Sequence, residues 1–119
     1  MAHGLSALYD TPHGVACAII LPTGLEYNKP VAGKRYRAIG KAMQVPGIDN
    51  MTDEEAADAT IAAVKQLSLD VGIPQNLNGI LKEEDVAFLS QSAYADACCP
   101  GNPRDTSEEE IAELYKSLL

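Results

Sequence analysis

The amino-acid sequence predicts an all-α protein, and three observations support this. The helix formers Ala, Leu, Glu and Lys are common, whereas Trp is absent and Phe occurs once, so an aromatic-rich sheet is not expected. Apolar residues recur at spacings of three and four along several segments, as on one face of a helix. Two segments begin with a hydroxyl residue followed three positions later by Glu, the pattern of a helix N-terminus. A chain of 119 residues is long enough for one modest core.

The first expected elements are short. Residues 1–9 form a short helix or the end of a longer one, and a stop is expected over residues 10–14 because Pro12 disfavours the helical conformation at Thr11. Residues 15–21 are apolar on every side, which predicts a fully buried element that stops at Pro22. Periodicity does not separate strand from helix in such a run, but its small residues favour a central helix.

Two amphipathic helices are expected next, over residues 31–43, after Pro30, and over residues 82–98. The first is broken by the Pro-Gly pair at 46–47, and the second is followed by a loop over residues 99–103 that is dense in turn formers. Their apolar faces carry Tyr36, Ile39 and Met43 in the first helix, and Val86, Leu89, Ala93 and Ala97 in the second.

Capping-box patterns mark the other two helices. Thr52 with Glu55 opens a helix that ends near Gly72, and the final helix starts at Thr106 or Ser107, again with Glu three residues on. The buried faces expected are Ala57, Ile61, Val64 and Ser68 in the former, and Ile111, Leu114, Tyr115 and Leu118 in the latter.

Composition argues against several classes of function. The formal net charge of −8 repels a phosphate backbone, and the basic residues at 34–37 form only one short turn, so nucleic-acid binding is not expected. The longest apolar run is too short to span a bilayer and no signal-peptide pattern is present, so we expect no membrane partner and a cytoplasmic location. Cys17, Cys98 and Cys99 match neither a disulfide framework nor a paired zinc spacing, which predicts reduced thiols.

Two histidines are the first candidates for chemistry. His13 lies between Pro12 and Gly14, where a rigid loop meets the apolar run, so its ring can point into a dry interior. A catalytic metal site takes about three protein ligands, so His3 and His13 do not complete one unless carboxylates join them. From the residues alone, a surface or packed histidine is the more frequent case for each.

The adjacent Cys98 and Cys99 suggest redox or nucleophilic chemistry. The expected position of Cys98 at a helix C-terminus disfavours a thiolate, so a small residue packed at a helix end is the favoured interpretation, and a strained redox pair stays open. The carboxylates at 53–55 and 108–110 are explained by the helix dipole. No phosphate-binding loop, dinucleotide fingerprint or serine nucleophile elbow occurs.

Several short sequence motifs occur in the order and spacing found in one enzyme family. Met1-Ala2-His3 and residues 8–16, Leu-Tyr-Asp-Thr-Pro-His-Gly-Val-Ala, resemble the histidine-bearing segment of group III, iron-containing alcohol dehydrogenases. The likeness runs over residues 1–119 and is closest to the lactaldehyde reductase and 1,3-propanediol dehydrogenase branch. The later matching segments are Leu21-Pro22, Asn28, Lys34-Arg35-Tyr36, Asp70-Val71-Gly72-Ile73-Pro74, Asp96-Ala97-Cys98, Asn102-Pro103-Arg104 and Glu113-Leu114-Tyr115.

The resemblance implies an architecture and residue roles. Residues 1–119 would be the C-terminal part of the helical, metal-binding domain, a helical bundle, with the N-terminal nucleotide-binding domain absent. The family holds Fe(II), or sometimes zinc, with one aspartate and three histidines, and His13 matches the last of these histidines. His3 matches a histidine beside the metal and the nicotinamide, which implies a proton relay or polar contact, and Cys98 matches a residue of the substrate pocket.

The resemblance also implies an activity. It implies an enzyme that interconverts small alcohols and aldehydes with NAD or NADP, by hydride transfer at a metal-polarised oxygen. With one of four metal ligands and no dinucleotide site, the isolated chain is expected to bind neither cofactor tightly and to be inactive. A truncated helical domain with only a structural or assembly role is the alternative, and a homodimer is left open.

Overall fold

The computed structural model describes residues 1–119, and every regular element in it is helical, so the all-α prediction is confirmed. The α-helices are α1 (Ala2–Tyr9), α2 (His13–Ala42), α3 (Asp53–Asp70), α4 (Val86–Tyr94) and α5 (Glu108–Lys116). Short 3-10 turns are η1 (Ile48–Asn50), η2 (Glu83–Asp85) and η3 (Cys99–Gly101). None of the helices combines the length and apolarity needed to cross a bilayer.

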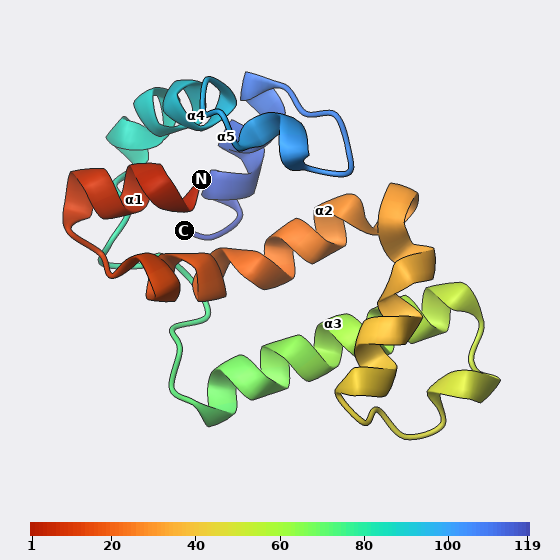
Figure 1. The fold of residues 1–119 in the computed structure, drawn as a ribbon. Coiled ribbons are helices and arrows are strands. Elements are labelled where there is room, and N and C mark those ends of the chain that lie inside the picture. The colour runs from red at the N-terminus through yellow and green to blue at the C-terminus, as the bar shows by residue number, and fades with distance from the viewer.

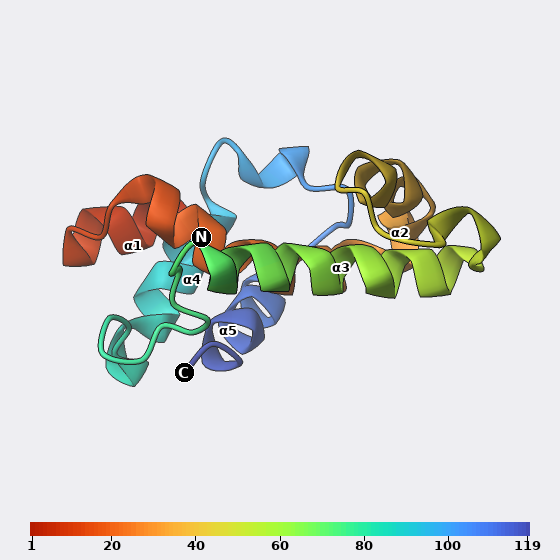
Figure 2. The same ribbon diagram turned by 90° about the horizontal axis from the view of Figure 1, so that it is seen from below.

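Helix α2 lies at the centre, with α1, α4 and α5 on one side and α3 on the other (Figures 1 and 2). A larger core joins α1, α4, α5 and the first half of α2, and Tyr115 and Leu89 are its largest fully buried members together with Leu5 and Leu77. A smaller core lies between the second half of α2 and α3, formed by Ala32, Tyr36, Ala57 and Ile61. The two cores share α2, which therefore fixes both halves of the molecule relative to each other.

The prediction of two separate elements at residues 15–21 and 31–43 is wrong, because α2 is one helix of 30 residues with Pro22 and Pro30 inside it. A proline removes one backbone hydrogen bond and favours a kink without necessarily ending the helix. In a straight helix Leu25 and Tyr36 would lie about 16 Å apart along the axis. The Tyr36 hydroxyl nevertheless donates to the Leu25 carbonyl at 2.8 Å, so α2 is bent, as Figure 1 shows.

Residues 15–21 are also less buried than predicted. Ala16 and Ile19 face the larger core, but Cys17 is exposed and Leu21 is 48% exposed. One face of this half of α2 is thus available to solvent or to another segment. The helix predicted over residues 82–98 is shorter than expected, since α4 ends at Tyr94 and Cys98 lies in the loop beyond it.

The two capping boxes are confirmed. At the start of α3, the Thr52 hydroxyl oxygen accepts a hydrogen bond from the Glu55 N–H, and the Glu55 carboxylate accepts one from the Thr52 N–H. Ser107 and Glu110 do the same for α5, so of the two predicted starts the later one is correct. These side chains satisfy backbone donors that the helices themselves leave free.

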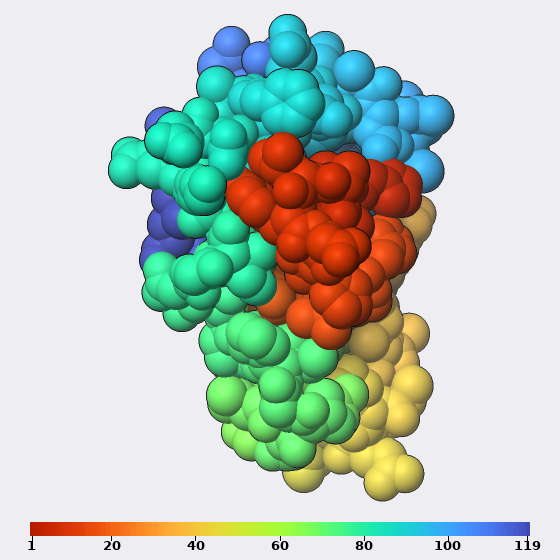
Figure 3. All heavy atoms as spheres, turned by 90° about the vertical axis from the view of Figure 1, so that its left-hand side faces the viewer, coloured from red at the N-terminus to blue at the C-terminus, as the bar shows by residue number.

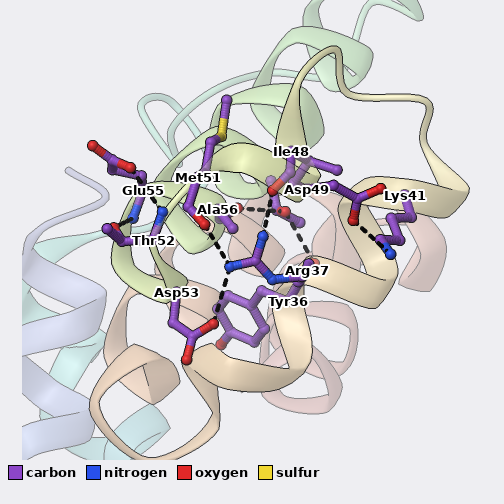
Figure 4. A network of polar contacts seen from close by, with 11 residues as sticks. Tyr36, Arg37, Lys41, Ile48, Asp49, Met51, Thr52, Asp53, Glu55 and Ala56 are labelled. Atoms are coloured by element: carbon purple, nitrogen blue, oxygen red, sulfur yellow. Dashed lines mark hydrogen bonds and ion pairs between the residues drawn. The ribbon is translucent and has the colours of Figure 1, made fainter.

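Arg37 ties α2 to the segment that leads into α3 (Figure 4). Its guanidinium donates to the carbonyls of Ile48 and Met51, the latter at 2.7 Å, and pairs with Asp53 at 3.0 Å. A planar guanidinium presents several donors in a fixed fork, so a single side chain reaches all three acceptors.

We expect Arg37→Lys to lower the free energy of unfolding by about 1–2 kcal/mol, because a lysine ammonium keeps the charge but cannot bond both carbonyls and the carboxylate in this geometry. Urea unfolding followed by circular dichroism measures the change. The matched control is Arg35→Lys at an exposed position of the same helix, which should leave the midpoint unchanged. Equal midpoints for the two variants would contradict the bridging role of Arg37.

Candidate functional site

A rigid turn between α1 and α2 places His13. Asp10 closes α1 in a left-handed conformation, with φ at 53°, which Asp tolerates better than most residues. Pro12 then precedes α2 with an extended ψ, so His13 is the first residue of the helix. Thr11, between Asp10 and Pro12, is buried, so the turn is packed against the interior of the protein. The predicted stop over residues 10–14 is therefore correct in position, although helix resumes already at His13.

This turn brings the two histidines together. The rings of His3 and His13 are stacked, with centroids 5.0 Å apart and planes 17° apart. His3 Nδ1 also lies 2.6 Å from Asp96 Oδ2, across 93 residues of sequence. Figure 3 shows the surface of α1 bordered by the segment that follows α4. Gly4 lets α1 lie close to α4, since a Cβ at this position would lie only 2.9 Å from Leu89 Cδ2.

Asp96 orients the His3 ring. Its Oδ1 accepts the backbone N–H of Cys98 at 2.8 Å, while its Oδ2 faces His3. The N–H of Cys98, and then the His3 contact, lower the pKa of the Asp96 carboxyl from 3.8 to about 2. The carboxylate is ionised at neutral pH and can only accept, so His3 Nδ1 carries the donated proton. His3 Nε2 is left as the atom that can exchange a proton or bind a ligand.

We expect the Asp96 carboxyl to titrate well below the ordinary 3.8, with a midpoint near 2, in a ¹³C NMR titration of its side chain. A carboxyl whose pKa is lower in the folded state than in the unfolded state stabilises the fold at pH values above its unfolded-state pKa. The contribution of Asp96 to the free energy of unfolding is therefore lost as the pH falls from about 4 to 2. His3→Ala should raise the midpoint only part of the way, because the Cys98 N–H remains. A wild-type midpoint near 3.8 would contradict the arrangement.

His13 has a weaker partner. Its Nε2 lies 3.4 Å from Cys17 Sγ, one helical turn along α2. A thiol is a poor hydrogen-bonding group, so an incoming ligand displaces it at small cost. Both side chains are exposed. The His13 ring is therefore held by stacking on His3 and by the helix start, and its nitrogen is accessible.

A largely apolar cavity of about 420 Å³ adjoins the two histidines. It lies between the start of α1, the first half of α2, the loop after α4, and α5. Cys98, Cys99, Cys17 and Asp96 all line it, and Ile20, Ile111 and Leu114 contribute apolar surface. A volume of this size accommodates a small organic molecule.

A loop bonded to α2 forms another wall of the cavity. Asn28 and Asn102 exchange two amide hydrogen bonds, at 2.8 and 2.9 Å. Arg104 donates to the Tyr27 carbonyl at 2.9 Å and lies 4.1 Å above the Tyr27 ring. These contacts hold the loop over residues 95–107 against the bend of α2, and so fix the wall that carries Cys98.

The structure thus brings all three predicted site residues, His3, His13 and Cys98, to one cavity. Cys98 is exposed to it, so the interpretation as a packed residue at a helix end is wrong. The sequence interpretation missed Asp96 and Cys17. Cys17 was detectable, because residues four apart share a helix face, but only if the helix begins at His13. Asp96 belongs to the matching segment Asp96-Ala97-Cys98, but its contact with His3 was not predictable because the two residues lie 93 positions apart.

The donor atoms present fit one ligand position of a transition-metal site. His13 offers an accessible imidazole nitrogen with no carboxylate partner, and neutral imidazole suits iron and zinc. A tight site takes about three protein ligands, and the chain contains only one other histidine, which is engaged by Asp96. The remaining ligands of a site at His13 would come from outside these residues.

Comparison with known proteins identifies the family of the chain. A model of the Fe-containing alcohol dehydrogenase family, C-terminal part, matches residues 1–119. Lactaldehyde reductase of Escherichia coli K12 is 47% identical over 116 residues, covering 97% of this chain and 30% of the relative. The 1,3-propanediol dehydrogenase of Klebsiella pneumoniae is 38% identical over 120 residues, which cover 31% of it. The chain spans about a third of the length of the curated relatives it matches.

Solved structures show the same fold. A crystal structure of a 1,3-propanediol oxidoreductase superimposes with a TM-score of 0.94 at 37% identity, covering 99% of this chain and 31% of the other. An alcohol dehydrogenase from Oenococcus oeni gives a TM-score of 0.92 at 36% identity, again over 31% of its length. The family match, the sequence identities and the fold agree: the chain belongs to the Fe-containing alcohol dehydrogenase family, to whose C-terminal, all-helical part residues 1–119 correspond.

Proposed function

We propose that residues 1–119 act as the helical, metal-binding part of an NAD(P)-dependent alcohol dehydrogenase that interconverts small alcohols and aldehydes. The observation that carries this proposal is the convergence of His3, His13 and Cys98 on one apolar cavity, with His13 accessible and His3 oriented by Asp96. The nicotinamide dinucleotide would bind a domain other than residues 1–119, and the cavity would lie in the cleft between the two.

The roles of the side chains follow from their contacts. His13 would supply one ligand to Fe(II) or zinc, which when bound provides Lewis acidity toward the substrate oxygen. Asp96 fixes the His3 ring so that Nε2 can move a proton or contact the nicotinamide, which supplies the hydride chemistry. Cys98, held by the loop pinned through Asn102 and Arg104, would shape the substrate pocket. Ile20, Ile111 and Leu114 would exclude water around a short alkyl chain.

The isolated chain should be inactive under this proposal, because it supplies one metal ligand of four and no dinucleotide site. A structural or assembly role without catalysis is the competing function. We further propose a cytoplasmic enzyme, and a homodimer as the assembly to test by size-exclusion chromatography.

A graft tests the catalytic proposal. Residues 1–119 would replace the matching third of E. coli lactaldehyde reductase, which moves His3, His13, Asp96 and Cys98 as one block. We expect metal-dependent reduction of lactaldehyde with NADH or NADPH by the graft, and none by the 119-residue chain. Circular dichroism and metal content verify that the graft is folded and loaded. A folded, loaded graft without turnover would favour the structural role and overturn the proposal.

A further inference from the structure

A second set of metal-binding side chains lies beside His13 but does not include it. His3, Asp96 and Cys98 each offer one ligand atom, and these three atoms lie within 4.8 Å of one another. His3 comes from α1, whereas Asp96 and Cys98 come from the loop after α4. We propose that this trio, named here the His3–Asp96–Cys98 site, binds a thiophilic divalent cation such as Zn²⁺, separately from the ligand position at His13.

The chemistry of the donors selects the cation. An imidazole nitrogen, a thiolate sulfur and a carboxylate oxygen are the three ligand types that zinc takes in proteins. Mg²⁺ and Ca²⁺ prefer all-oxygen sets, which this site does not provide. Three protein ligands leave one tetrahedral position for water or for a ligand in the adjoining cavity. The trio therefore matches an open, three-ligand zinc site.

The site is partly organised before any ion binds. Asp96 is anchored through Oδ1 by the Cys98 N–H and through Oδ2 by His3, and its side chain is 21% exposed. Ligand bonds of 2.0–2.3 Å require donor atoms about 3.5 Å apart. Cys98 is exposed, so its side chain can rotate toward the other two ligand atoms, and the 2.6 Å between His3 Nδ1 and Asp96 Oδ2 would widen if both atoms bind the ion. Ion binding needs the Cys98 thiolate and an unprotonated His3 nitrogen, so the Cys98 proton would be released to solvent and the His3 ring would carry its one proton on the nitrogen that does not bind the ion.

Binding at the His3–Asp96–Cys98 site does not depend on the proposed dehydrogenase activity. The effect of ion binding on activity does rest on the proposed dehydrogenase function, because His3 and Cys98 are the residues proposed to face the nicotinamide and the substrate. A cation held there would occupy part of the cavity wall and would therefore compete with both in a complete enzyme.

Cobalt is the probe for the binding test, because Co²⁺ occupies zinc sites and a Co–thiolate bond absorbs in the near ultraviolet. The reduced 119-residue chain would be titrated with Co²⁺ in the absence of oxygen and chelators, and then with Zn²⁺. We expect one equivalent of Co²⁺ to produce the thiolate charge-transfer band, and Zn²⁺ to remove it by displacement. A wild-type chain without this band would overturn the proposal.

Matched variants locate the ion. Cys98→Ser should abolish the band, whereas Cys17→Ser and Cys99→Ser, at the other two thiols, should retain it. His3→Ala and Asp96→Asn should each weaken binding at least about 10-fold, since even the loss of an indirect ligand contact costs 10–100-fold. His13→Phe, which keeps an aromatic face against His3, should leave the affinity unchanged. A band that is lost in Cys17→Ser or His13→Phe would place the ion at the His13–Cys17 pair and overturn the assignment. Circular dichroism of each variant confirms its fold.

Discussion

Gly40→Ala is expected to lower the free energy of unfolding by about 2–3 kcal/mol, because an added Cβ is more crowded here than at any other glycine of the chain. Gly40 is buried where α2 crosses α3, and a Cβ there would overlap Ile48 Cδ1 and Thr60 Oγ1. The Thr60 hydroxyl cannot move away freely, because it bonds the carbonyls of Ala56 at 2.7 Å and Tyr36 at 3.0 Å inside the fold. Urea unfolding monitored by circular dichroism measures the loss.

Two further variants distinguish overpacking from helix propensity. Gly24→Ala adds the same methyl group to the same helix with no atom within 4 Å, so it should raise stability by up to about 1 kcal/mol. Ile48→Val in the Gly40→Ala background removes one of the clashing groups and should recover part of the loss, giving a non-additive cycle. If Gly40→Ala unfolds at the wild-type urea concentration, the close packing of α2 on α3 is contradicted.

Local patterns predicted the helix starts correctly, because a capping box is satisfied within four residues. Thr52 with Glu55 and Ser107 with Glu110 form the predicted reciprocal bonds. The continuity of α2 was not predictable from such patterns. The expected break at Pro22 follows from a local rule, and contacts between distant residues override it. The hydrogen bond from Tyr36 to Leu25 across the bend is one of these contacts.

The candidate site, too, combines residues that the sequence identified with contacts that only the tertiary structure determines. His3, His13 and Cys98 were identified through their match to a family pattern, and residue types alone gave no reason to bring them together. Their partners depend on tertiary structure: His3 meets Asp96 only because α1 packs against the end of α4. The stacking of His3 on His13 depends on the left-handed Asp10 and on Pro12, whose combined geometry no periodicity encodes.

In a grafted enzyme loaded with Fe(II), His13→Ala is expected to abolish activity by removing the iron, whereas His3→Ala should reduce turnover with the iron retained. Loss of an indirect ligand contact already costs 10–100-fold in metal affinity, so loss of the His13 ligand should cost at least about 100-fold. Loss of a positioned acid–base group at His3 should lower kcat by about 100-fold or more. Iron content per protein and kcat, measured on the same preparations, separate the two roles.

Because the His3 and His13 rings stack on each other, replacing either one by alanine also removes support from the other. His3→Phe keeps an aromatic face against His13 while removing the nitrogen bonded to Asp96, so it should retain iron as well as wild type and still lose turnover. Asp96→Asn leaves both rings in place but removes the obligate acceptor, so His3 can adopt either tautomer. Its turnover should fall between those of wild type and His3→Phe, with a changed pH profile. If His3→Phe loses iron to the same extent as His13→Ala, then His3 is itself a ligand and the division of roles between the two histidines is wrong.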